Sequence, residues 1–194
     1  MSNSAIARRS ATADRISAHA QVLTDTGGLD GFTMDDLAVA ADVSRRTLFN
    51  YFPSKIDAVL GTWPTFGDDD VARFRDGGPH GDLLRDLREM LMPLLETKLE
   101  DREALARSRR ILLHEERLMA AVHRRYTDLS CELVEHIAAR EGATFHTVRA
   151  RVAVGLLAAL FDTALDEYLL DAEERPFLHH FDESLRTART VLGA

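Results

Sequence analysis

Apolar residues recur at helical spacing along almost the whole chain, and no strand-like alternation of apolar and polar residues appears. In the first segment Ile16, Ala20 and Leu23 share one face, and Gly27 and Gly28 are suited to end that helix. Further amphipathic helices are expected near residues 80–99, 101–113, 115–140, 144–170 and 177–192. The pattern predicts an all-α protein.

The segment 33–55, TMDDLAVAADVSRRTLFNYFPSK, has the pattern of two short helices around a tight turn. Thr33 is expected to cap the first helix, and Asp35 and Asp36 lie in its first turn, where the helix dipole favours negative charge. Ser44 offers a new N-cap, Pro53 ends the second helix, and Ser54 is expected to cap the helix that follows. The segment therefore predicts a helix-turn-helix.

The second of these helices has one packing side and one outward side. Leu48 and Phe52 share one side, and Arg46 and Asn50 lie nearly opposite them. Arginine can donate two hydrogen bonds to guanine, and asparagine can pair with adenine in the major groove. We therefore expect this helix to read base edges.

Other polar residues of the segment suit the DNA backbone. The hydroxyls of Ser44, Thr47 and Tyr51 match phosphate oxygens, and Lys55 lies in the first turn of the next helix, where a phosphate would be favoured. Phe49 has two interpretations, contact with a thymine methyl group or packing. The whole pair also has a second interpretation, because similar helix pairs occur in ordinary helical proteins, where adjacent arginines are only a solvated face.

The order of a capped helix, a hydrophobic turn, T-L-F-x-Y-F and then P-S-K resembles the DNA-binding domain of tetracycline-repressor (TetR) family transcriptional regulators. The resemblance covers residues 10 to 60, roughly, and does not identify a ligand. It implies phosphate contacts from Thr33, Thr47, Tyr51 and Lys55, and base contacts from Arg45, Arg46 and Asn50.

The distribution of charge refines this interpretation. The formal net charge is −8; residues 1–60 hold 6 basic and 7 acidic groups, and the remainder holds 18 and 25. Nonspecific affinity for DNA depends on the number of phosphates neutralised, so this balance favours a selective DNA binder. Arg8 and Arg9 are either a basic segment that reaches a phosphate or the minor groove, or a solvated terminus.

Two domains are expected, a helix-turn-helix domain over residues 1–60 and a helical ligand-binding and dimerisation domain over residues 61–194. The helix that begins at Lys55 is expected to end near Trp63 and Pro64, and a short helix is expected between Asp68 and Gly77.

The penultimate helix predicts a dimer. Between Val152 and Leu165 only Asp162 is charged, so this helix must be covered on several sides. A reading helix of two turns contacts few base pairs, and a two-fold dimer doubles them; TetR-like regulators use their last two helices in this way. The alternative is a monomer core. The expected interface residues are Gly155, Ala158, Ala159, Phe181, Leu185 and Ala188.

Aromatic and aliphatic residues at helical spacing are the candidates for an interior pocket. Such a lining is more often plain core, but the family resemblance favours a pocket for a hydrophobic or amphipathic small-molecule effector. The expected lining residues are Trp63, Phe66, Phe74, Leu87, Leu91, Leu95, Leu112, Met119, Val122, Tyr126, Leu157 and Phe161.

Several classes of function are not expected. Cys131 is the only cysteine, which favours a reducing cytoplasm and leaves no disulfide or cysteine-based zinc site. The first residues lack the apolar run of a signal peptide, and Val152–Phe161 is too short to span a bilayer. The sequence has no glycine-rich phosphate loop and no G-x-S-x-G motif, so no catalysis, metal or cofactor is expected.

We therefore expect a TetR-like regulator, a repressor rather than an activator, that binds a palindromic DNA operator as a homodimer and is released by its effector. The alternative is a dimeric helical protein that binds a small molecule or partner without sequence-specific DNA binding.

Overall fold

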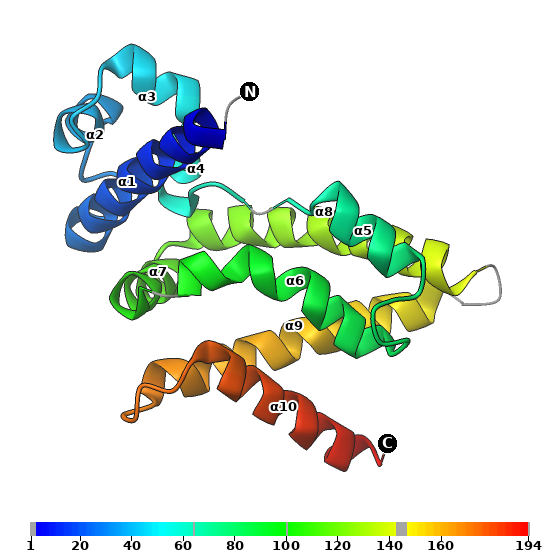
Figure 1. Ribbon diagram of the computed structural model, residues 1–194. Helices are drawn as coiled ribbons and strands as arrows, with labels where there is room; N and C mark the ends of the chain where they lie inside the picture. Colours follow the sequence, from blue (N-terminus) through cyan, green and yellow to red (C-terminus); the bar gives the residue numbers. More distant parts are fainter. Residues whose placement is uncertain (1–2, 64, 100, 143–146, 194) are drawn as a thin grey trace. The chain divides into compact units, whose positions relative to one another are not determined.

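A computed structural model describes residues 3–63, 65–99, 101–142 and 147–193, and every regular element in these residues is an α-helix (Figure 1). The all-α prediction is confirmed. The helices are α1 (Asn3–Gly27), α2 (Met34–Ala40), α3 (Arg45–Tyr51), α4 (Lys55–Leu60), α5 (Asp68–Arg75), α6 (Leu83–Leu99), α7 (Arg102–His114), α8 (Glu116–Glu141), α9 (Thr147–Leu170) and α10 (Phe177–Leu192).

The helix boundaries follow the sequence pattern with one clear exception. Helix α4 ends at Leu60 rather than near Trp63, because Gly61 leaves the helical conformation with a positive φ of 69°, which glycine adopts most readily. The helix expected from residue 144 begins at Thr147 in the part of the chain that the structure describes; residues 144–146 lie outside that part.

The chain forms two compact units. Unit 1 comprises Met1–Pro64 and Glu103–Tyr126, and unit 2 comprises Thr65–Arg102 and Thr127–Ala194. Helix α7 and the first half of α8 thus join the N-terminal helices. The sequence pattern did not assign this second segment to them, and the functional division at residue 60 stays a prediction.

The core of unit 1 holds the helix-turn-helix in place. Helix α1 packs against α2 and α4, with Ile16 and Ala20 fully buried. Leu37 of α2 and Leu48 of α3 are also fully buried in this core, which Ile111 and Leu118 of the second segment complete. The positions of α2 and α3 therefore depend on both segments of unit 1.

Side-chain caps begin the three short helices. The Oγ1 atom of Thr33 accepts a hydrogen bond from Asp36 N–H at 3.1 Å, and the Asp36 carboxylate accepts from Thr33 N–H at 2.8 Å. The hydrogen bonds from Thr33 lower the pKa of Asp36. The side chains of Ser44 and Ser54 cap α3 and α4 by accepting hydrogen bonds from Thr47 N–H at 3.0 Å and Asp57 N–H at 3.2 Å. The predicted caps are confirmed, and each stabilises its helix by about 1 kcal/mol.

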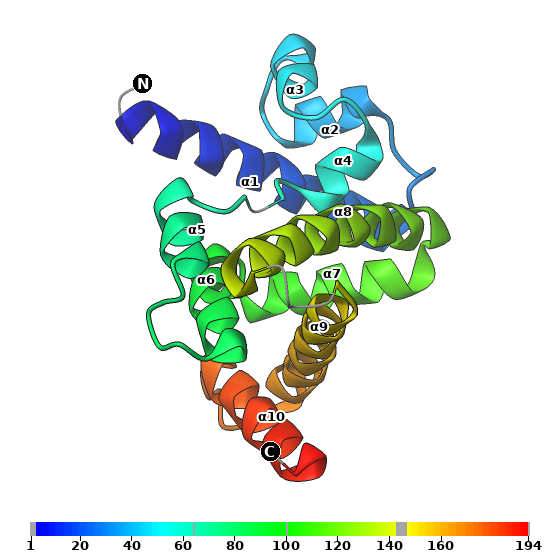
Figure 2. The ribbon, with the colours of Figure 1, turned by 90° about the vertical axis from the view of Figure 1, so that its right-hand side faces the viewer.

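In unit 2, helices α9 and α10 run side by side in opposite directions (Figure 1), and Figure 2 shows the same pair in a view nearly along α9. The ring of Phe177 packs 5.2 Å from that of Phe161 and 5.9 Å from that of Tyr168, centroid to centroid. The Tyr168 hydroxyl donates to the carbonyl of Leu99 at 3.0 Å, which ties α9 to α6. No helix in the described residues is long and apolar enough to cross a membrane.

A buried ion pair also stabilises unit 2. The Arg140 guanidinium donates to Asp86 Oδ2 at 2.6 Å, and the two side chains are 4% and 0% exposed. Burial alone would raise the pKa of Asp86, but hydrogen bonds from Arg140 and from His80 N–H outweigh it, so the pKa is lowered. Arg140 also donates to the carbonyl oxygens of Phe74 and Gly77, so it joins α8 to the end of α5.

Candidate nucleic-acid interface

Helix α3 has the two-sided character that its sequence predicts. Leu48 and Phe52 are buried at 0% and 4% exposure, and Arg46 and Asn50 on the opposite side are exposed. Among the described residues, the side chains of Arg46 and Asn50 have no hydrogen-bond partner. Their donors and acceptors are therefore available to a ligand.

Arg45 differs from its neighbour. Its guanidinium forms an ion pair with Asp35 of α2 at 3.2 Å and lies 5.6 Å from the ring centroid of Phe49. Both charged side chains are exposed, at 68% for Arg45 and 60% for Asp35, and Phe49 is 42% exposed. The three side chains expected to read bases are thus unequal, because Arg45 must leave Asp35 before it can bind anything else.

The N-terminal arginines extend this surface. Arg8, Arg9 and Thr12 of α1 line one shallow hollow together with Thr47, Asn50 and Tyr51 of α3. The Arg9 guanidinium lies 5.8 Å from the Tyr51 ring centroid. Both arginines belong to α1 rather than to a loose tail, so the structure favours the interpretation in which they add positive charge beside α3.

The expected phosphate-binding hydroxyls lie at the helix starts. Thr33, Ser44 and Thr47 are near the first residues of α2 and α3, where the first two are N-caps. The Thr33 hydroxyl donates to the Asp36 carboxylate at 2.7 Å, and the hydroxyl oxygens of Ser44 and Thr47 are 2.7 Å apart. These groups therefore order the helices, and their phosphate contacts stay a prediction.

Lys55 has a structural role that sequence reasoning missed. Its ammonium donates to the carbonyl oxygens of Leu29 at 2.5 Å and Phe32 at 2.9 Å, and it lies 5.1 Å from the Phe32 ring centroid. These bonds tie the start of α4 to the loop between α1 and α2. Lysine has three donors, so one remains for the expected phosphate contact.

Polar contacts also join the two segments of unit 1. Glu115 accepts a hydrogen bond from Leu29 N–H at 2.9 Å. The Arg110 hydrogen bond lowers the pKa of Asp25. The ion pairs are Arg110 with Asp25 at 2.6 Å, Arg117 with Asp30 at 2.9 Å and Arg125 with Asp57 at 2.8 Å. Asp25, Asp30 and Asp57, three of the seven acidic residues within residues 1–60, are therefore neutralised by arginines of the second segment of unit 1.

The structure separates the residues expected to line one pocket. In unit 1, Trp63, Leu112 and Val122 line a hollow together, whereas Met119 and Tyr126 are 44% and 37% exposed. The others belong to unit 2, where Phe74, Leu87 and Leu157 are buried, Leu91 and Phe161 are half-buried, Phe66 lies edge-on to His136, and the Leu95 side chain is outside the described residues.

The residues expected at a dimer interface also fall into two groups. Phe181 and Leu185 are buried inside unit 2, at 0% and 9% exposure. Gly155 and Ala159 are exposed, and Ala158 and Ala188 are half-buried. In a dimer of the expected kind, a second copy could therefore contact Gly155 and Ala159 directly, whereas Phe181 and Leu185 pack within their own copy.

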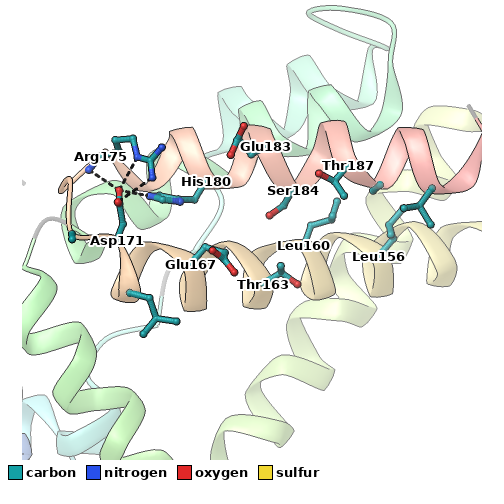
Figure 3. Close-up of a pocket in the computed structure, with 14 residues that line it drawn as sticks. Leu156, Leu160, Thr163, Glu167, Asp171, Arg175, His180, Glu183, Ser184 and Thr187 are labelled. Carbon is teal, nitrogen blue, oxygen red and sulfur yellow. Dashed lines mark hydrogen bonds and ion pairs between the residues drawn. The ribbon is translucent and has the colours of Figure 1, made fainter.

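An open groove of about 710 Å³ runs between α9 and α10 (Figure 3). Its walls include Leu156, Leu160 and Thr163 of α9 and Ser184 and Thr187 of α10. The same two helices leave further apolar side chains uncovered, with exposed fractions of 68% for Val148, 63% for Val152, 81% for Leu170 and 77% for Val191.

A charged cluster closes one end of the groove (Figure 3). Asp171 accepts hydrogen bonds from the Arg175 guanidinium at 2.9 Å, from Glu173 N–H at 3.0 Å and from His180 Nε2 at 3.1 Å. The Arg175 hydrogen bond is the main reason why the pKa of Asp171 is strongly lowered. The cluster fixes the turn that sets α10 against α9.

The histidines do not form a metal site in the described part of the chain. His136 is buried, and its Nδ1 atom lies 2.8 Å from Arg75 Nη2. Its Nε2 atom is 3.6 Å from Glu132. Among the described residues, no group of three histidine, cysteine or acidic side chains could hold a metal ion.

Comparison with known proteins agrees with the geometry of unit 1. Residues 16–57 match the model of the tetR family of bacterial regulatory proteins, a range that includes the C-terminal half of α1, all of α2 and α3, and the start of α4. No curated protein matches the chain significantly. The matched range contains the capped helix pair and the exposed side of α3. The N-terminal part of the chain is therefore a DNA-binding domain of the TetR family type.

Proposed function

We propose that this regulator is a cytoplasmic repressor that binds a palindromic operator as a homodimer and releases it when a hydrophobic small molecule binds. The observation that carries the proposal is the outward side of α3, where Arg46 and Asn50 are exposed and their side chains have no hydrogen-bond partner among the described residues. Groups of this kind in an exposed helix can satisfy their hydrogen bonds on base edges.

Arg46 and Asn50 are the principal base readers in this proposal, with guanine and adenine as their partners. Arg45 reads a base only after it separates from Asp35, and Phe49 contacts a thymine methyl group. The backbone phosphates are held by the surrounding polar groups, which are Thr33, Ser44, Thr47, Tyr51 and Lys55 with Arg8 and Arg9. Phosphate contacts set the register of the helix but carry no sequence information.

The uncovered side of α9 supports the homodimer. Val148, Val152, Gly155 and Ala159 follow one another at intervals of three or four residues and are all exposed. This spacing places them on one side of the helix, and the glycine and alanine permit close approach of another helix. Contiguous exposed apolar surface of this kind is typical of protein interfaces. A second copy would complete a four-helix bundle with α9 and α10.

Repression and release follow from the dimer. A dimer on its operator blocks polymerase without any activating surface. An effector that binds one conformation of the dimer better than another shifts the spacing of the two reading helices and thereby the affinity for the operator.

A gel-shift assay with DNA from around the protein's own gene tests this function. We expect retardation of a palindromic fragment at moderate salt in the presence of random competitor DNA, and loss of that retardation in Arg46→Ala. Failure to bind any such fragment, with a dimeric mass and measurable binding of an apolar ligand, would replace the regulator by a small-molecule or partner-binding protein.

A further inference from the structure

We propose that a partly open hollow in unit 1, next to Trp63, is a binding site for a single-ring aromatic molecule that acts as the effector. This inference rests on the proposed function and names the class of effector. The hollow has a volume of about 150 Å³. Its walls come from α1, α4, the segment after α4, α7 and α8, and consist of Gln21, Val59, Leu60, Trp63, Ser108, Ile111, Leu112, Leu118 and Val122.

The volume and lining select the ligand. Apolar cavities of about 150 Å³ accept molecules the size of benzene, whereas pockets for drug-sized ligands span about 300–1,000 Å³. Seven of the nine lining side chains are apolar. One ring therefore fits within the hollow, whereas a long acyl chain or a fused ring system would extend beyond its walls.

Two polar side chains at the wall favour a ring with a single hydroxyl or amino group. Gln21 donates through its amide nitrogen to the carbonyl of Val59 at 3.1 Å. This leaves its amide oxygen as an acceptor. The Ser108 hydroxyl has no hydrogen-bond partner among the described residues. A phenol placed between them can donate to Gln21 and accept from Ser108.

The position of the hollow links an occupant to the reading helix. Val59 belongs to the core that also holds Leu48 of α3, and the Gln21 hydrogen bond joins α1 to α4. Across the hollow, α8 holds the end of α4 through Arg125, which donates to Asp57 and to the carbonyl of Gly61. A ligand that separates α4 from α7 and α8 would therefore displace the support of the helix-turn-helix.

Trp63 reports on the site directly, because it is the only tryptophan in the chain. It is 37% exposed, and the Arg125 guanidinium lies 5.6 Å from its ring centroid. We expect phenol and toluene to change its fluorescence with saturation, phenol at the lower concentration, and anthracene to have no saturable effect. Calorimetry on the same samples measures binding independently of fluorescence.

Matched variants locate the site. Val122→Phe fills the hollow and weakens phenol binding by about tenfold or more, since an overfilled site must distort to admit a ligand. Leu113→Phe introduces the same ring at a side chain that is 71% exposed on α7, and binding is unchanged. If Val122→Phe does not fold, Ser108→Val serves instead, and it abolishes the preference for phenol over toluene.

The results separate this inference from the proposed function. Phenol at saturation should change operator affinity several-fold in the wild-type protein and not in Val122→Phe. Absence of saturable binding, or equal binding by Val122→Phe, overturns the site while operator binding by the same protein leaves the regulator intact. Saturable binding without any change in operator affinity overturns the role as effector.

Discussion

The two adjacent arginines of α3 offer a sharp test, because the same substitution should have different effects at the two positions. Arg46→Ala removes a guanidinium with no hydrogen-bond partner in the described residues. A bidentate contact with guanine contributes about 1–3 kcal/mol of discrimination, which corresponds to about 5–150-fold in affinity for the operator. Scrambled DNA lacks the guanine in register, so its affinity should change much less.

Arg45→Ala should cost less than Arg46→Ala. In the wild-type protein, Arg45 must first leave Asp35, which lies 3.2 Å away in an exposed ion pair. Exposed ion pairs contribute about 0.2–1 kcal/mol, so the loss of operator affinity in Arg45→Ala should be smaller than that in Arg46→Ala by up to about fivefold. Asp35→Asn removes the competing carboxylate and should tighten DNA binding by a similar factor.

Fluorescence anisotropy with operator and scrambled duplexes over a range of salt concentrations measures these differences. Because all three side chains are exposed, the free energy of unfolding should stay within about 0.5 kcal/mol of wild type. Equal losses for Arg45→Ala and Arg46→Ala on both duplexes would refute the distinction between a paired and an unpaired reader. Weaker binding by Asp35→Asn would refute the competition between Asp35 and DNA.

Other parts of the structure lead to further expectations. Lys55→Met keeps most of the apolar stem of the side chain but removes the hydrogen bonds to the carbonyl oxygens of Leu29 and Phe32. We therefore expect the free energy of unfolding, measured by urea titration, to fall by about 1.5–3 kcal/mol. Unchanged stability would mean that the lysine contributes to DNA binding alone. Asp86→Ala removes the buried partner of Arg140, which keeps only the more exposed Glu141 carboxylate at 2.9 Å, and it should cost about 3 kcal/mol; a loss below about 1 kcal/mol would contradict the role of this pair. Because the pKa of Asp86 is lowered in the folded protein, its contribution is complete above the carboxyl pKa of the unfolded chain, near 3.9, and is lost as the pH falls further; urea titrations of wild type and Asp86→Ala should therefore converge in acid. Ala159→Arg places a charge on the exposed side of α9 and should convert a dimer to a monomer in sedimentation, whereas Arg109→Ala on α7 should not; a dimer that survives the first change would place the interface elsewhere.

Local features were predictable because their causes are local. The caps at Thr33, Ser44 and Ser54 depend on residues within three positions, and Pro53 ends α3 for steric reasons of its own. The side of α3 that packs follows from helical spacing alone. Helix periodicity therefore sufficed for the fold class and for the exposed side of the reading helix.

Contacts between distant segments were not predictable in this way. Asp30 and Arg117 are 87 positions apart, and no local pattern relates them. Lys55 looked like a phosphate ligand because its backbone acceptors, Leu29 and Phe32, lie in a loop whose path the sequence does not define.

The sequence of an apolar helix face also does not show which element, or which copy of the chain, packs against it. Phe181 and Leu185 pack inside unit 2, whereas Gly155 and Ala159 of the neighbouring helix remain exposed. Spacing identified both groups as apolar surface but could not separate contacts within one copy from contacts between copies. The same limit applies to the aromatic residues, which the structure divides between the hollow of unit 1 and the core of unit 2.

Selection of bound sequences from a random DNA pool, carried out with wild-type protein and with Arg46→Ala, tests most directly whether α3 reads bases as half of a symmetric pair. The account predicts that the wild-type protein enriches an inverted repeat with a guanine at one position of each half-site, and that Arg46→Ala loses the preference at that position in both halves while the rest of the motif persists. Enrichment of the same motif by both proteins, or of no repeat by either, would contradict it.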